Sequence, residues 1–255
     1  MNKFAKTLIV AGSLIALGAC ASGPRGPSNA VIARALTNAP GAAQPSTIVA
    51  TEVAYARDAS QRGQFVAGVD YAAPGAVLHG RNGPVAFAGI AAALQNSGVS
   101  AEWESRAVVM SCDGALAISQ GRFTDQDGFV GNYVTAWVRQ TDNSYKWVYD
   151  VAGRDDPQPP ARADRTEDGD IVVTAIDSIQ GLVATCPRRG KPVPPPPAIP
   201  IGEDGASSAQ LSGDGTLRWR WEHRANGIKY VTAEYFYQGQ WLTAIEESLA
   251  SPLEE

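Results

Sequence analysis

The stretch from Ala101 to Gly153 contains four strand-length segments that are rich in valine, tyrosine, tryptophan and phenylalanine. Short polar turns separate them: Asp113–Gly114, a TDQDG run and a TDNS run. β-Branched and aromatic residues bounded by turn residues are typical of strands, and connections this short join antiparallel neighbours. The sequence therefore predicts an antiparallel sheet of four strands in this part of the chain.

Three helical segments and one short strand precede this sheet. Ser46 is the expected N-cap of the first helix, whose apolar residues Ile48, Val49, Val53, Ala56 and Ala59 recur at helical spacing up to Gly63. A second helix is expected to end at Pro74–Gly75, and a third at Gly98 after the short strand AVLHG. This order predicts an α+β fold in which a curved sheet wraps around the first helix as a cone.

A second β-rich region, residues 170–255, follows a charged and proline-rich linker at residues 154–169. It contains a proline-rich connector at residues 190–200, which is expected to be a rigid spacer, and it ends in a meander of strands. In the run LRWRWEH, Leu217, Trp219 and Trp221 alternate with charged residues, which indicates one buried and one wet face. We expect the aromatic face to pack on the first domain; the alternative is a platform for glycan strands.

The tetrapeptide YVTA occurs in both sheets, each time after a DG-x-L turn. The first turn begins at Asp113 and lies 20 positions before Tyr133, whereas Asp214 lies 16 positions before Tyr230, so the connections differ in length. The region before Asp214 has only short strands and a proline run that excludes a long helix. The sequence therefore predicts that a three-strand meander recurs, and not a whole domain.

The N-terminus predicts export and lipidation. Leu8–Ala19 is apolar or small throughout, which is too short to cross a membrane but suits the h-region of an export signal. The run ends in LGAC, which resembles the lipobox of bacterial lipoproteins and implies a signal peptide at residues 1–19, an acylated Cys20, a flexible tether at 20–45 and, with alanine at position 21, the outer membrane. The alternative is an ordinary secretory signal that leaves Cys20 free.

Cys112 and Cys186 remain in the part of the chain that follows the tether. An oxidising compartment favours a disulfide between them, which would close a loop of 74 residues. Two separately buried thiols are the alternative, because the sequence does not supply the distance between them.

Composition excludes several kinds of partner. The formal charge of −5 and an isoelectric point near 5.1 argue against a nucleic-acid partner. The two histidines lie 144 positions apart, and no Cys-x-x-Cys, calcium loop or phosphate-binding glycine loop occurs. We therefore expect no metal and no cofactor.

The element order and several stretches of residues 46–153 resemble the nuclear transport factor 2-like superfamily, and within it the SnoaL-like bacterial domains. The most specific stretch is GNYVTAWVRQTDNSYKWVYDVAG, which ends at Gly153. The resemblance implies a cone whose interior is an active site or holds a ligand, and a possible homodimer through the sheet. By the same resemblance, the ligand-binding residues are Tyr55, His79, Trp103, Tyr133, Trp137 and Asp150.

The sequence assigns no catalytic residue. Isomerase members of this superfamily need a carboxylate base just after the first strand, where this chain has Gly80 with His79 beside it. An acid–base group would have to come from His79, Asp150 and Tyr55, and each of these residues also has a structural interpretation.

We therefore expect a non-catalytic periplasmic lipoprotein that binds a small apolar ligand in the cone or serves an accessory role in the envelope. Two alternatives remain open. One is an isomerase-, cyclase- or dehydratase-like enzyme, and the other is a structural or oligomerising protein.

Overall fold

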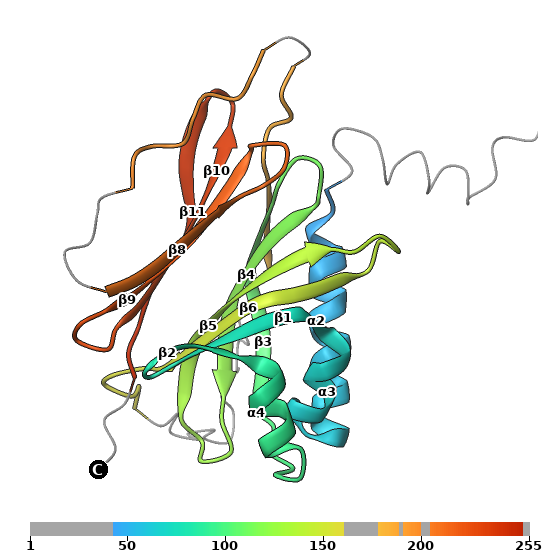
Figure 1. Cartoon of the computed structure of the whole chain (residues 1–255), viewed down its shortest axis with the longest axis vertical. Helices are drawn as coiled ribbons and strands as arrows, with labels where there is room; N and C mark the ends of the chain where they lie inside the picture. The colour runs from blue at the N-terminus through green and yellow to red at the C-terminus, as the bar shows by residue number, and fades with distance from the viewer. Residues whose placement is uncertain (1–42, 161–177, 189–190, 200–204, 252–255) are drawn as a thin grey trace, which may run out of the picture. The chain divides into compact units, whose positions relative to one another are not determined.

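The computed structural model describes residues 43–160, 178–188, 191–199 and 205–251. Within these ranges the chain is α+β, with a mixed seven-stranded sheet and a second sheet of four antiparallel strands (Figure 1). The helices are α2 (Pro45–Arg62), α3 (Gln64–Tyr71) and α4 (Phe87–Leu94). None of the described helices is long and apolar enough to cross a membrane.

The first sheet contains the four predicted strands, a longer strand that includes the predicted AVLHG strand, and two short strands. Its strands are β1 (Ala72–Gly80), β2 (Gly83–Ala86), β3 (Glu102–Met110), β4 (Leu116–Thr124), β5 (Val130–Arg139), β6 (Tyr145–Arg154) and β7 (Gln180–Val183), in the order β2-β1-β6-β5-β4-β3-β7. Neighbours are antiparallel except β1–β6 and β3–β7, which are parallel. The chain that follows the linker thus contributes an edge strand, β7, to the first sheet.

The second sheet is a meander. Its strands are β8 (Gly205–Leu211), β9 (Leu217–Arg224), β10 (Lys229–Tyr237) and β11 (Gln240–Leu249), in the order β11-β10-β9-β8. β8 has no counterpart among the predicted strands, because its GASSAQL sequence lacks β-branched and aromatic residues. The IVVTAI run at residues 171–176, whose β-branched residues are typical of a strand, lies outside the described residues.

Helix α2 differs from its prediction at its start and in its buried face. Pro45 occupies the first turn and Gln44 is the N-cap, so the prediction of Ser46 is wrong. The helix ends at Gly63, as predicted, with a positive φ of 86°. The side chains that face the sheet include Ile48 and Glu52, whereas Val53 is 52% exposed. Ile48 and Ala59 are fully buried, as expected, and Glu52 takes the place on the buried face that was expected for Val53.

Helix α3 and strand β1 also differ from their predictions. The helix ends at Tyr71, before the predicted stop at Pro74–Gly75, and β1 begins at once with Ala72. Gly75 has a positive φ of 78° and lies where the pairing of β1 with β6 shifts its register between Ala72 and Val77. The proline–glycine pair therefore bends the strand and does not end a helix.

The seven-stranded sheet is covered on both faces, with the helices on one side and the β8–β11 sheet on the other (Figure 1). On β3, Val108 and Met110 belong to the helix-side core, and Val109 lies in the core between the sheets. This alternation follows from the period of two along a strand. The outer sheet face, through which the family resemblance implies pairing, is occupied by the chain's own second sheet.

The aromatic face of β9 packs on the first sheet. Leu217 is fully buried and Trp219 is 6% exposed, and the ring centroid of Trp219 lies 4.9 Å from that of Tyr149 on β6. Trp221 lies between Tyr149 and His79. The expected packing is confirmed, and the alternative of an exposed glycan platform is wrong for these side chains.

The repeat is longer than the sequence predicted, because four strands recur: β3–β6 and β8–β11 have the same order and the same first turn. In those turns, Ser111 Oγ donates to Asp113 Oδ1 at 2.6 Å, and Ser212 Oγ donates to Asp214 Oδ1 at 2.6 Å. The two turns also contact each other, because the Asp113 backbone N–H donates to Asp214 Oδ2 at 2.9 Å. The recurring unit is therefore a hairpin pair that packs face to face on its own copy.

The two YVTA runs occupy equivalent places in this arrangement. Val134 and Ala136 of β5, and Val231 and Ala233 of β10, all lie in the core between the sheets. Each run is followed at once by a register shift in the pairing with the next strand. Tyr133 and Thr135, the other two residues of the first run, point to the opposite face, toward the helices, where they line the site described next.

Cys112 and Cys186 form a disulfide with a Cα–Cα distance of 5.0 Å. It joins the end of β3 to the segment that follows β7. That segment contacts both sheets, because the Ala184 N–H donates to the Met110 carbonyl at 2.9 Å and the Thr185 N–H donates to the Phe236 carbonyl at 2.8 Å. The bond therefore fastens the place where the chain passes from one sheet to the other.

Candidate functional site

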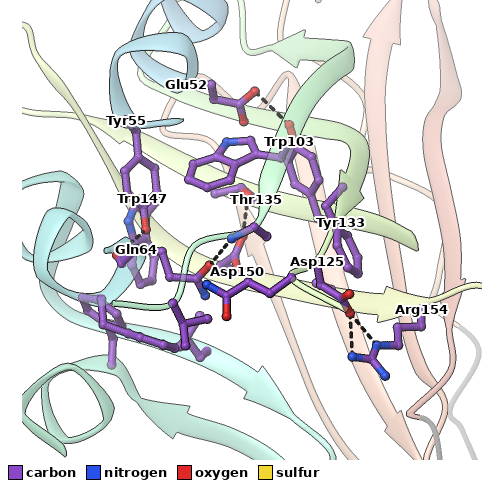
Figure 2. A pocket seen from close by; sticks show the side chains of 18 of the residues that line it. Glu52, Tyr55, Gln64, Trp103, Asp125, Tyr133, Thr135, Trp147, Asp150 and Arg154 are labelled. Carbon is purple, nitrogen blue, oxygen red and sulfur yellow. Dashed lines mark hydrogen bonds and ion pairs between the residues drawn. The ribbon is translucent and has the colours of Figure 1, made fainter. Parts of the chain in front are cut away.

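A cavity of about 460 Å³ lies between the helices and the inner face of the seven-stranded sheet (Figure 2). Eight of its described lining side chains are aromatic: Tyr55, Phe65, Phe87, Trp103, Phe123, Tyr133, Trp137 and Trp147. α2 contributes one wall and strands β5 and β6 contribute the opposite wall. The cone is therefore hollow, and its interior is mainly apolar.

Glu52 of α2 lies in this wall, although it is only 3% exposed. Its carboxyl accepts hydrogen bonds from Ser119 Oγ at 2.5 Å, from Tyr133 OH at 3.1 Å and from Ser105 Oγ. Burial raises the pKa of Glu52 from 4.5 to about 7, against the opposing effect of the Ser119 and Tyr133 hydrogen bonds, and the charge of Asp150 raises it further. Every bond partner of Glu52 is a hydroxyl, which can donate to the carboxylate or accept from the carboxylic acid.

Glu52 is the site residue that sequence reasoning missed. A glutamate near the start of a helix is usually exposed to solvent, and it indicates only that a helix begins there. The available signal was spacing: Glu52 lies four positions after Ile48 and seven before Ala59, and both of these residues are fully buried.

Asp150 of β6 also lines the cavity. Thr135 Oγ1 donates to Asp150 Oδ1 at 2.6 Å, across the β5–β6 pair in which the two residues are opposite. No hydrogen bond from the described part of the chain reaches its other oxygen, Oδ2. Burial raises the pKa of Asp150 from 3.8 to about 6, while the Thr135 hydrogen bond and the charge of Lys229 act in the opposite direction.

His79 does not line the cavity, so its prediction as a ligand-binding residue and as a partner of Asp150 is wrong. Its neighbour Leu78 pairs with Asp150 in register and lines the cavity, and successive side chains on a strand point to opposite faces. His79 therefore faces the second sheet, where its Nδ1 lies 2.5 Å from Tyr149 OH and its Nε2 lies 2.9 Å from His223 Nδ1. Burial, followed by the charges of His223 and Lys229, lowers its pKa from 6.5 to about 4.

The other predicted ligand-binding residues do meet in the cavity: Tyr55, Trp103, Tyr133, Trp137 and Asp150. Tyr55 OH donates to the Gln64 carbonyl at 3.3 Å, and its ring stands edge-on to Trp103 at a centroid distance of 4.9 Å. Trp137 Nε1 donates to Ser119 Oγ at 2.9 Å, which connects it to the Glu52 network. These contacts fix the rings that form the cavity wall.

Trp147 has an indole N–H without a hydrogen-bond partner among the described residues. The side chain is 2% exposed, lines the cavity and packs edge-on against Phe87. A buried donor of this kind costs free energy unless an acceptor reaches it. It is therefore a donor buried within the cavity wall that no described residue satisfies.

The lining also includes the turn between β4 and β5. Arg154 at the end of β6 forms an ion pair with Asp125 at 2.6 Å (Figure 2). It forms a second ion pair with Asp127 at 3.1 Å, and its guanidinium lies over the Phe129 ring. Asp127 is exposed and Asp125 is largely covered. The only cationic side chain among the described lining residues is therefore already paired with acidic partners.

The described residues contain no group of three or more histidine, cysteine, aspartate or glutamate side chains that is arranged to hold a metal ion. Glu52 and Asp150 are the two lining carboxyls away from the Arg154 ion pairs, and hydroxyl groups surround the first of them. The arrangement offers hydrogen bonding and proton transfer to a ligand at Asp150 within an aromatic cavity, while Glu52 is occupied by its hydroxyl partners.

The chain matches no protein-family model and no curated protein. The solved structures that are similar to it include the following two. A nuclear transport factor 2 (NTF2-like) superfamily protein from Salmonella enterica subsp. enterica serovar Typhimurium str. LT2 is 12% identical, with a TM-score of 0.32 over 48% of this chain and 99% of that chain. A protein of unknown function with a cystatin-like fold, from Methylobium petroleophilum PM1, is 15% identical, with a TM-score of 0.33 over 52% of this chain and 96% of that chain.

Proposed function

We propose that this protein binds a small, largely apolar molecule in the cavity between α2 and the seven-stranded sheet. The observation that carries the proposal is a hollow of about 460 Å³ whose described lining includes eight aromatic side chains. Binding sites for small molecules fall at roughly 300–1,000 Å³ and combine apolar walls with a few polar groups. The polar groups here include Asp150 Oδ2, which receives no hydrogen bond from the described chain.

We further propose that the protein is a lipoprotein of the outer membrane that faces the periplasm, anchored through an acylated Cys20. The lipobox-like LGAC run supports this, together with the disulfide between Cys112 and Cys186, because disulfides persist in oxidising compartments outside the cytoplasm. The resemblance of residues 46–153 to SnoaL-like domains belongs to the same proposal. A cavity for an apolar molecule fits a protein anchored in the envelope.

A second candidate function is acid–base catalysis on the bound molecule. It is favoured by one observation: Asp150 lies in the cavity with a pKa of about 6 and an oxygen free to take a proton from a ligand. If the protein is an enzyme, the role of Glu52 is to hold the hydroxyl groups of Ser105, Ser119 and Tyr133 in place. Liquid chromatography coupled to mass spectrometry of molecules incubated with the protein separates the two functions, since a binding protein returns them unchanged, whereas an isomerase changes their retention time and other enzymes also change their mass.

Replacing Ala101 with tryptophan is expected to block the cavity. Ala101 lines it just before β3, and its hydrogen bonds involve only its backbone: the N–H donates to Gln64 Oε1 at 3.0 Å, and the carbonyl accepts from Ser100 Oγ at 3.1 Å. We expect N-phenyl-1-naphthylamine to bind the wild-type protein with enhanced fluorescence, and Ala101→Trp to weaken that binding at least about ten-fold, because the indole fills the space the dye needs.

The matched control is Ala93→Trp. Ala93 is exposed on α4 and does not line the cavity, so this variant carries the same extra indole outside the site. Its dye affinity should equal that of the wild type. Equal losses in both variants, or no dye binding by the wild-type protein, would refute the proposed function.

A further inference from the structure

The cavity lining carries an excess of acidic groups. Its described residues include four carboxyl side chains, Glu52, Asp125, Asp127 and Asp150, against the single cationic side chain of Arg154. Arg154 is committed to two of the four, at 2.6 and 3.1 Å. The cavity therefore presents negative charge that the described chain does not neutralise.

Of the remaining two carboxyls, only Asp150 is open to a ligand. Glu52 receives hydrogen bonds at both of its oxygens from three hydroxyl groups. Asp150 receives one hydrogen bond, from Thr135 to Oδ1. Its Oδ2 thus receives no hydrogen bond from the described chain.

Charged and titratable groups surround Asp150 on α2, β5, β6 and β10. Helix α2 contributes Glu52 and Tyr55, β5 contributes Tyr133, and the neighbouring Tyr149 lies on the other face of β6. The cation that acts on it is Lys229 of β10, whose Nζ donates to the Ala152 carbonyl at 2.7 Å and which does not line the cavity. No cation therefore contacts Asp150 from within the cavity.

The walls around this carboxyl are aromatic. A desolvated cation over the face of a tryptophan or tyrosine ring is attracted by the negative face of the ring, and a carboxylate beside it adds a charge-assisted hydrogen bond. A neutral apolar molecule would leave Asp150 desolvated and without a counter-charge, which is costly. An anionic molecule would add repulsion from Asp150.

We propose that the molecule bound in this cavity is a hydrophobic amine, whose ammonium group donates to Asp150 Oδ2 while its apolar body lies among the aromatic walls. This inference rests on the proposed function, since it names the class of ligand for the same site. The choice of an amine over an alcohol or an acid comes from the charge and hydrogen bonding of the lining residues.

The titration of Asp150 makes the proposal sensitive to pH. Burial raises the pKa of its carboxyl to about 6, and an ammonium group binds the ionised form. Binding of the amine therefore displaces the proton from Asp150, and the affinity falls as the pH decreases through about 6. An alcohol of the same shape gains little from the ionised form, so its affinity changes less.

The test uses three probes of one shape: 1-naphthylmethylamine, 1-naphthalenemethanol and 1-naphthoate. Isothermal titration calorimetry of the wild-type protein at pH 7.5 should give a dissociation constant for the amine at least about ten-fold lower than for the alcohol, and the naphthoate should bind most weakly. In Asp150→Asn, the amine and the alcohol should bind within about two-fold of each other, with the affinity for the alcohol unchanged.

Asp127→Asn is the matched control, because it removes one lining carboxylate that is already paired with Arg154. It should keep the preference for the amine. Should Asp150→Asn fail to fold, the wild-type protein still provides a test: from pH 7.5 to pH 5 its affinity for the amine should fall at least about five-fold, and its affinity for the alcohol should stay within about two-fold.

The outcomes separate the two proposals. If neither the amine nor the alcohol binds, the cavity is not a binding site and both proposals fail. If the alcohol binds as tightly as the amine, or the naphthoate binds most tightly, the cavity is a binding site and the amine proposal alone is overturned. The amine proposal would also be overturned if Asp127→Asn and Asp150→Asn lost the preference for the amine over the alcohol equally. The net negative charge of the cavity, and not a contact with Asp150, would then explain the preference.

Discussion

Replacing Cys112 and Cys186 together with alanine is expected to lower the free energy of unfolding by about 4 kcal/mol. The bond closes a loop of 74 residues, and removing it restores the conformational freedom of that loop in the unfolded chain. Cys112 is also 3% exposed in the core between the two sheets. Urea unfolding of the purified protein without reductant, followed by tryptophan fluorescence, measures the change.

A reducing agent supplies the control for this prediction. It should lower the unfolding midpoint of the wild-type protein and leave the midpoint of the doubly substituted protein unchanged. A loss below about 1 kcal/mol in the substituted protein would show that the segment from Ala184 to Cys186 is held by its backbone hydrogen bonds alone, and the role we assign to the disulfide would be wrong.

Glu52→Gln is expected to change how stability depends on pH. The pKa of Glu52 in the folded protein, about 7, lies above its ordinary value of 4.5, so the folded state holds the proton more tightly than the unfolded state. The stability from this proton is complete below pH 4.5 and is lost as the pH rises through 7. The wild-type protein should therefore lose up to about 3 kcal/mol from this group over that range.

Glutamine has the same shape and no charge, and its amide can pair with the three surrounding hydroxyls. We expect Glu52→Gln to be about as stable as the wild-type protein at pH 5 and more stable than it at pH 8, as measured by thermal unfolding at several pH values. Glu102→Gln is the control, because Glu102 is exposed on β3, and its curve should follow the wild type. Parallel curves for all three proteins would contradict a buried, neutral Glu52.

The strands of the first sheet were predictable because their signals are local. Alternation over about nine residues and the turns at Asp113–Gly114 and Asp142 need no information from distant parts of the chain. The same holds for the end of α2 at Gly63, whose positive φ suits glycine. The pairing of β7 with β3 and of β1 with β6 joins segments that are far apart in the sequence. The residues of these strands alone do not predict which partner each strand has.

The site was predicted in part, and its two errors have the same kind of cause. His79 was placed in the cavity although the residue before it, Leu78, faces inward, and a shift by one residue along a strand exchanges the two faces. Val53 was expected on the buried face of α2, but the face that meets the sheet contains Glu52 instead. In both cases the phase of the element depends on tertiary packing, which the local pattern does not determine.

The six tryptophans of the chain can report directly whether a ligand binds in the cavity between the helices and the inner face of the seven-stranded sheet. Three of them line the cavity: Trp103, Trp137 and Trp147. The other three belong to the second sheet: Trp219, Trp221 and Trp241. Each gives one indole N–H signal in a ¹H–¹⁵N correlation spectrum.

Titration of the ¹⁵N-labelled protein with 1-naphthalenemethanol should move the three cavity signals and leave the three signals of the second sheet in place. The largest shift is expected at Trp147, whose N–H has no partner among the described residues of the unliganded protein. Shifts confined to the tryptophans of the second sheet, or no shift at saturating concentration, would contradict the account.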